Sequence, residues 1–371
     1  MAASPQFPSS YSAIVEKLDA IDPVQYGKTR NYIHGAVTCL SPYLSRGVLS
    51  TRQVLEQVIA KGYALPQIET FVKELAWRDY FQRVAQHKNI NEHIRQPQAP
   101  VSNHEIPVNI IKGTTGIEGV DQAIQCLYQT GYMHNHCRMY TAALACNLAQ
   151  SHWHHPAQWM YYHLLDGDWA SNACSWQWVA GANSSKKYWA NQENINRYTN
   201  TNQKNTFLDT SYEQLVVAKI PLALADTEKY PLELVLPESS LPTLNPQVPT
   251  FVYNYYNMDP LWHKNEPGNR ILLIEPDFFG RYPIHKRCWD FLLALCENIA
   301  GIQVYVGSFS SLADRLPGVP VYYKEHPFNR HYTGIREERE WMAPEVSNYY
   351  PSFSAYWKKV EKTLKQKAKS S

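Results

Sequence analysis

The segment at residues 163–181, HLLDGDWASNACSWQWVAG, gathers side chains that could do chemistry within a short stretch. They are Asp166, Asp168, Asn172, Trp176 and Trp178. Two carboxylates this close repel each other, and the pKa of one rises unless a cation or hydrogen-bond donors compensate. Arg138, in the segment TGYMHNHCRMY, is the candidate cation, because a bidentate arginine–carboxylate pair is geometrically rigid. The alternative is a structural tie within a loop that binds no ligand.

Two segments place polar and apolar side chains on one face of a predicted helix. The first set is Glu74, Trp77 and Arg78 in FVKELAWRDYF, and the second is Asn135, Arg138 and Met139 in TGYMHNHCRMY. Both sets stand at positions i, i+3 and i+4, which lie on the same side of a helix. Such a face suits a polar ligand held against an apolar wall. Taken alone, an ordinary polar stripe beside a core residue is the more common explanation.

A third pattern lies in HGAVTCLSPYLSRGVLS. It holds Thr38, Ser41 and the backbone amides around Pro42 at a predicted helix start. Hydroxyls and free amides in this position suit a phosphate group. Simple helix capping is the more common use of the same residues.

Helical periodicity dominates residues 10–218, where apolar residues recur at three- and four-residue spacing and strand-like alternation is scarce. Residues 219–268 are rich in proline without a clear period, which predicts a linker or an extended strap. Residues 269–371 predict a small α/β segment. Its strands are RILLIEP, IQVYVG and VPVYYKE, its first helix ends at Gly301, and a last helix lies in a basic tail. The predicted fold class is therefore mainly α with a small α/β segment.

Composition excludes several classes of protein. The 371 residues carry a net charge of +2, so composition alone does not indicate nucleic-acid binding. The seven cysteines form no C-x-x-C pair, which argues against a zinc ribbon, an iron–sulfur cluster and a disulfide scaffold. Without a signal-peptide pattern or a long apolar run, the sequence predicts a cytoplasmic protein that does not span a membrane. The run SHWHHP is expected to bind no metal, because adjacent histidines point in different directions.

The order of these motifs is more specific than any one of them. GTTGIEGVDQAI, TGYMHNHCRM, LLDGDWASNACSWQWVAG and ELAWRDYF together resemble the FAD-binding domain of the photolyase/cryptochrome family. The resemblance covers about residues 20–210. It implies a helical FAD-binding domain at 1–218, followed by the linker at 219–268 and the α/β extension at 269–371.

The resemblance also implies roles for individual residues around FAD. Contacts to the cofactor or its surroundings fall to Tyr26, Thr38, Cys39, Leu40, Ser41, Glu74, Arg78, Asn135, Arg138, Asp166, Asp168 and Asn172. In this arrangement Arg138 pairs with Asp166 beneath the isoalloxazine, Asp168 accepts a hydrogen bond from the flavin, and Asn172 faces flavin N5. Trp176 and Trp153 would pass electrons to the flavin.

The implied activity is light-driven repair of cyclobutane pyrimidine dimers in DNA. The residues that match the dimer cavity are Glu74, Trp77, Asn135, Met139 and Trp178. A flipped-out dimer would stack on Trp77 and Trp178, and Glu74 would hydrogen-bond to it.

Several residues depart from the family pattern. The third tryptophan of the electron chain falls on Ile110, so photoreduction is expected either to be slower or to use another ring, such as Trp159 or Tyr162. His136 replaces an arginine near the substrate phosphates. Gly119, Cys174 and Ser175 replace a proline and two glycines of the motifs.

The family's usual N-terminal antenna domain does not precede the FAD motifs, so a protein partner that supplies it is one expectation. Three functions stay open at this point. They are a DNA repair flavoenzyme, a flavin photoreceptor or signalling protein, and a non-catalytic FAD-binding subunit of a larger complex.

Overall fold

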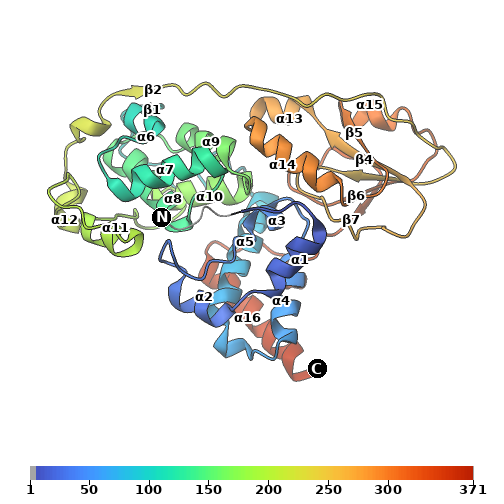
Figure 1. Ribbon diagram of the computed structural model, residues 1–371, viewed down its shortest axis with the longest axis horizontal. Helices are drawn as coiled ribbons and strands as arrows, with labels where there is room; N and C mark the ends of the chain where they lie inside the picture. Colours follow the sequence, from blue (N-terminus) through green and yellow to red (C-terminus); the bar gives the residue numbers. More distant parts are fainter. Residues whose placement is uncertain (1–5, 371) are drawn as a thin grey trace. The chain divides into compact units, whose positions relative to one another are not determined.

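The computed structural model describes residues 6–370, without the side chains of 368–370, and the chain divides into two compact units. The first unit is formed mainly by Val24–Val37 and His87–Leu232, and the second by Phe7–Pro23, Thr38–Gln86 and Glu233–Ser371. Figure 1 follows both along the chain. No helix in the described part of the chain is long and apolar enough to cross a membrane.

The first unit is almost entirely helical. Its elements are α2 (Pro23–Thr29), β1 (Ile106–Pro107), α6 (Val108–Lys112), α7 (Glu118–Thr130), α8 (Asn135–Ala143), the π-helical turn η2 (Leu144–Leu148), α9 (His154–His163), α10 (Trp169–Val179), α11 (Gln192–Thr199), α12 (Tyr212–Val216), η3 (Leu222–Leu224) and β2 (Thr227–Glu228). Its core is unusually aromatic, since Trp153, Trp159 and Trp169 are fully buried. Glycine and side-chain caps punctuate these helices, because Gly131 ends α7 in a left-handed conformation and Asp168 caps α10.

The second unit combines helices with a parallel sheet. Its helices are α1 (Tyr11–Asp19), α3 (Ser41–Ser45), α4 (Thr51–Ala60), η1 (Leu65–Gln67), α5 (Glu69–His87), α13 (Pro276–Arg281), α14 (Lys286–Cys296), α15 (Phe309–Ala313) and α16 (Phe353–Ser370). A capping box begins α4, where Ser50 and Gln53 bond each other's backbone N–H groups at 3.0 and 2.8 Å. The apolar face of α16 is buried through Tyr356, Val360 and Leu364.

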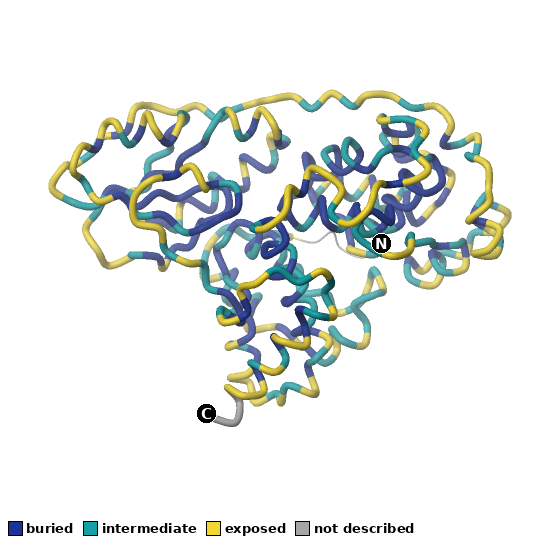
Figure 2. Tube along the Cα trace, turned by 180° about the vertical axis from the view of Figure 1, so that it is seen from behind, coloured by how far each residue is buried: buried dark blue, intermediate teal, exposed yellow. Residues whose placement is uncertain are grey.

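The five strands of the sheet are parallel and run in the order β5-β4-β3-β6-β7. They are β3 (Thr250–Tyr253), β4 (Asn269–Ile274), β5 (Ile302–Val306), β6 (Val321–Lys324) and β7 (Ile335–Glu337). In chain order this is 3-2-1-4-5, a doubly wound arrangement whose direction reverses between β3 and β6. In Figure 2 most of the sheet, on the left of the view, is coloured dark blue or teal, for buried and intermediate residues.

The predicted fold class is confirmed, and all three predicted strands form as β4, β5 and β6. Two details differ. The central strand β3 lies inside the proline-rich range 219–268, where residues 229–249 form the longest run without helix or strand. Helix α14 ends at Cys296, and Gly301 instead takes a positive φ of 71° in the turn before β5.

The unit boundaries also differ from a helical domain at 1–218, because Thr38–Gln86 groups with the C-terminal part of the chain. Buried polar contacts explain this grouping. Asp79 on α5 accepts hydrogen bonds from the Thr51 hydroxyl at 2.9 Å and from the Met342 backbone N–H at 3.1 Å. The Arg83 guanidinium lies 3.6 Å from the centre of the Trp341 ring, a cation–π contact.

The Asp79 contacts generate a stability prediction. Asp79→Ala removes the acceptor of two buried donors, and we expect the free energy of unfolding to fall by about 2–4 kcal/mol. Urea unfolding of the purified protein measures this. Asp290→Ala is the control, because Asp290 pairs with Lys286 on an exposed helix face and should change stability by less than about 1 kcal/mol. Equal effects of the two substitutions would contradict the role given to Asp79.

Candidate functional site

The polar centre of the first unit is an ion pair between α8 and the turn before α10. Arg138 Nη2 donates to both carboxylate oxygens of Asp166, at 3.0 and 2.8 Å, and Arg138 Nε donates to the Met133 carbonyl at 2.7 Å. The Asp166 side chain is 4% exposed and that of Arg138 is 22% exposed. The expected pair therefore forms, with one guanidinium nitrogen serving both oxygens instead of a two-nitrogen fork. It fixes the guanidinium at three points.

Asp168 lies on the same turn but has a different partner. Its side chain accepts from the Ser171 backbone N–H at 2.8 Å and so caps the N-terminus of α10. The residue is 3% exposed. The two carboxylates thus avoid mutual repulsion because one meets a cation and the other meets a helix end.

Asn172, one turn into α10, has an anchored amide. Its Nδ2 donates to the Ala157 carbonyl on α9 at 2.8 Å, and the residue is 9% exposed. No described residue donates to the Asn172 amide oxygen. The neighbouring Ser171 hydroxyl is buried and also has no hydrogen-bond partner in the described part of the chain. The Ser171 oxygen is thus a buried polar atom without a partner in the described residues, a feature typical of ligand sites.

The first turns of α8 carry the other predicted residues of this unit. Asn135 is exposed, and Met139 is partly buried one turn further on. The Asn135 Nδ2 lies 3.9 Å from the Met139 sulfur, a weak contact that aligns the two side chains along the helix. The i, i+4 spacing read from the sequence therefore gives one shared face.

Tryptophan burial in this unit is extensive. Trp176 is 2% exposed and Trp153 is fully buried, while Trp178 is partly exposed and tilts against Tyr188 at a ring distance of 5.9 Å. Trp153 stacks on Trp169 with ring centroids 6.4 Å apart. The Trp169 N–H in turn donates to the exposed Asn91 at 2.8 Å.

The indole in contact with Trp153 is therefore Trp169. The sequence instead pointed to Trp159 or Tyr162, but the Trp159 N–H donates to the Tyr128 hydroxyl at 3.0 Å. Sequence spacing held no signal for Trp169, because the loop between α9 and α10 decides which rings meet. Ile110 is fully buried and leaves the expected third position without an aromatic ring.

The remaining predicted residues lie in the second unit, except Tyr26, which lies on α2 of the first. The Arg78 guanidinium donates to the Ser45 hydroxyl at 2.8 Å, and Glu74 is partly exposed on the same helix. Trp77 stacks face to face on Phe353 of α16, with ring centroids 3.7 Å apart and planes 9° apart. Phe353 is a residue that the sequence analysis did not single out.

The loop before α3 holds the other predicted contacts. The Thr38 hydroxyl accepts from the Leu40 backbone N–H at 3.3 Å, and Cys39 takes a left-handed φ of 51°. Ser41 is the first residue of α3. Leu40 is 1% exposed.

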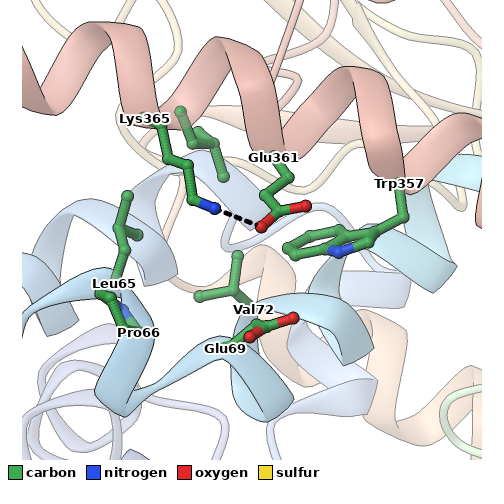
Figure 3. A pocket seen from close by; sticks show the side chains of 8 residues that line it. Leu65, Pro66, Glu69, Val72, Trp357, Glu361 and Lys365 are labelled. Carbon is green, nitrogen blue, oxygen red and sulfur yellow. Dashed lines mark hydrogen bonds and ion pairs between the residues drawn. The ribbon is translucent and has the colours of Figure 1, made fainter.

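Two hollows occur in the second unit, and neither is lined by a predicted residue. One encloses about 360 Å³ along α16 and the start of α5. Figure 3 shows Leu65, Val72 and Trp357 at its walls and the Lys365–Glu361 ion pair at its rim. The other encloses about 330 Å³ at the carboxyl ends of β3, β4 and β6, where doubly wound sheets bind ligands.

Comparison with known proteins gives a family match. Residues 71–213 match the family model described as the FAD binding domain of DNA photolyase. Cryptochrome DASH of Ostreococcus tauri is 31% identical over 223 residues, which are 56% of this chain and 40% of that protein. A deoxyribodipyrimidine photo-lyase of Alkalihalophilus pseudofirmus is 31% identical over 147 residues, which are 38% of this chain and 30% of that protein. The chain thus spans less than half the length of these relatives.

A solved cryptochrome structure from Synechocystis aligns with 53% of this chain and 44% of its own, at 26% sequence identity and a TM-score of 0.47. The family match at residues 71–213 covers the motifs of α5, α8 and α10. Residues 71–213 contain the twelve predicted site residues that run from Glu74 to Trp178.

The histidines of α8 generate a pH prediction. His134 Nε2 lies 3.1 Å from the Arg30 carbonyl oxygen, and its Nδ1 accepts from the His136 backbone N–H at 3.3 Å. A neutral ring with the proton on Nε2 satisfies both contacts. Burial, with a further effect of His136, lowers the pKa of His134 to about 4.

Because the unfolded chain binds this proton nearer pH 6.5, the folded state is fully stabilised above pH 6.5 and loses stability as pH falls toward 4. We expect a loss of roughly 1–3 kcal/mol in this window, which His134→Asn should reduce. Chemical unfolding at pH 7, 5.5 and 4.5 measures it, with His34→Asn at an exposed position as the control. An unchanged pH slope in His134→Asn would contradict the prediction.

Proposed function

We propose that the chain is a light-driven DNA repair flavoenzyme, because residues 71–213 match the family model described as the FAD binding domain of DNA photolyase. Its substrate is a cyclobutane pyrimidine dimer flipped out of DNA. FAD is the cofactor of this family, and when bound it supplies light absorption and the electron that splits the dimer. The residues of the chain hold and orient both molecules.

The anchored amide of Asn172 is the observation that supports this proposal best. Its nitrogen is occupied by the Ala157 carbonyl, so its oxygen is the atom left to accept a hydrogen bond from a ligand. An amide oxygen suits an N–H donor, which flavin N5 provides only when the ring is reduced. The acceptor that Asn172 presents therefore suits the N5–H group of a reduced flavin, and the buried Ser171 hydroxyl precedes it in the same helix.

Arg138 supplies a fixed positive charge on α8 of the same unit. Asp166 holds the guanidinium in place, so a positive charge stands on α8 without a mobile side chain. A fixed cation stabilises a negatively charged ring without reorganisation when charge develops. Thr38, Ser41 and the backbone around Cys39 would hold the phosphates, with Tyr26, Arg78 and Asp168 as further contacts.

The proposed substrate contacts are of three kinds: hydrogen bonds, contacts with a wall of the site, and ring stacking. Glu74 would bond the base edges, Asn135 and Met139 would line one wall, and flat bases would stack on Trp77 and Trp178. Trp176 and Trp153 would supply electrons to the cofactor. DNA is the partner in this proposal, and its phosphate contacts would make binding salt-dependent.

A second function, flavin-based photoreception or signalling, is favoured by one observation. The face of Trp77 that a base would use is stacked on Phe353 at 3.7 Å. A protein that only senses light needs no open aromatic wall for a substrate. Light-dependent reduction of bound flavin without dimer loss would identify this second function.

The repair assay tests the main proposal. Protein with bound FAD is reduced by light and given DNA with one defined thymine dimer, and we expect dimer loss in the light and none in the dark. Asn172→Asp places a negative charge beside the reduced ring, and we expect repair roughly tenfold slower, which corresponds to about 1.4 kcal/mol in the barrier. Asn202→Asp makes the same change at an exposed position and serves as the control. Light-independent loss, or equal rates in both variants, would refute the role of Asn172.

A further inference from the structure

The contact between α5 and α16 centres on one aromatic pair. The rings of Trp77 and Phe353 are nearly parallel, and their centroids are 3.7 Å apart. Tyr80 lies edge-on to Phe353 at 5.9 Å, and the Tyr80 hydroxyl donates to the Tyr350 carbonyl at 3.2 Å. One face of the Trp77 indole is therefore covered from within its own unit.

Phe353 is placed where its ring can move without unfolding the helix. It is the first residue of α16 and is partly exposed, whereas the buried anchors of the helix, Tyr356, Val360 and Leu364, follow it. Further along the contact between α5 and α16, the hollow of about 360 Å³ lies between α16 and the start of α5. Figure 3 shows this hollow. The ring of Phe353 is thus a peripheral contact of a helix that is held elsewhere.

A planar aromatic ring at 3.7 Å occupies the space that a stacked nucleobase would need. Bases stack on tryptophan because both present flat π faces, and Phe353 offers the same interaction intramolecularly. No base can stack on that face of Trp77 while Phe353 is there. The two rings are direct competitors for one surface.

We propose that Phe353 sets the specificity of this site by gating the stacking face of Trp77, so that only a base already extruded from DNA displaces it. The proposal rests on the proposed function, because it assigns Trp77 to the substrate wall. A lesion base, whose stacking within the duplex is weakened, is released to compete with Phe353 at lower cost than an undamaged base. Phe353 therefore suppresses binding of undamaged bases and also weakens binding of the lesion.

The experiment compares Phe353→Ala with Phe353→Tyr, which keeps the stacking ring. Labelled duplexes with and without one thymine dimer are titrated in the dark and followed by fluorescence anisotropy, after unfolding curves establish that both variants are folded. We expect Phe353→Ala to bind the dimer duplex about 2- to 12-fold more tightly than Phe353→Tyr, the range equivalent to one aromatic stack. The Trp77→Ala, Phe353→Ala double variant should lose this gain.

Each other result overturns the proposal in a distinguishable way. Dimer preference with equal affinities in both variants refutes the gate and leaves the repair function standing. A gain in Phe353→Ala that persists without Trp77 shows that the ring covers some other surface. Absence of dimer preference in the natural protein and in every variant refutes the gate and the repair function together.

Discussion

The buried ion pair between Arg138 and Asp166 is the constraint on which the candidate site depends. A carboxylate that is 4% exposed needs a cation or hydrogen-bond donors to compensate for its burial, and Arg138 meets it with one nitrogen on both oxygens. The pair joins α8, which carries Asn135 and Met139, to the turn that starts α10. The Asn172 bond to Ala157 adds α9, so three helices hold one polar surface in a fixed geometry.

The second unit also depends on a buried carboxylate that accepts hydrogen bonds from other segments of the chain. Asp79 on α5 is buried and meets donors from α4 and from the C-terminal segment, and Arg83 stacks on Trp341. These contacts make the segment around Met342 part of the core of its unit. The Phe353 ring is an outlying part of the same contact surface. The C-terminal segment, which the sequence analysis predicted as an extension, therefore forms part of the surroundings of Trp77.

The sequence analysis predicted those parts of the fold that depend on local residue patterns. Periodicity identified the helices of the first unit and three strands of the sheet, and the i, i+4 rule placed Asn135 beside Met139. It missed β3, because Thr250–Tyr253 follows a proline-rich stretch and is too short to show a period. It also missed Trp169 and Phe353, whose partners lie 16 and 276 positions away. Such contacts depend on how helices pack, and no spacing rule encodes them.

Flavin binding is the property on which the repair function, the signalling alternative and the role of Asn172 all depend. The most direct measurement is the absorption spectrum of the purified protein during titration with FAD, for the natural chain and for Asp166→Asn. Saturable binding that Asp166→Asn weakens by about tenfold or more, equivalent to at least 1.4 kcal/mol, is the predicted result. A protein that binds no FAD, or one whose affinity is the same in Asp166→Asn, would contradict the assignment of this polar surface to the cofactor.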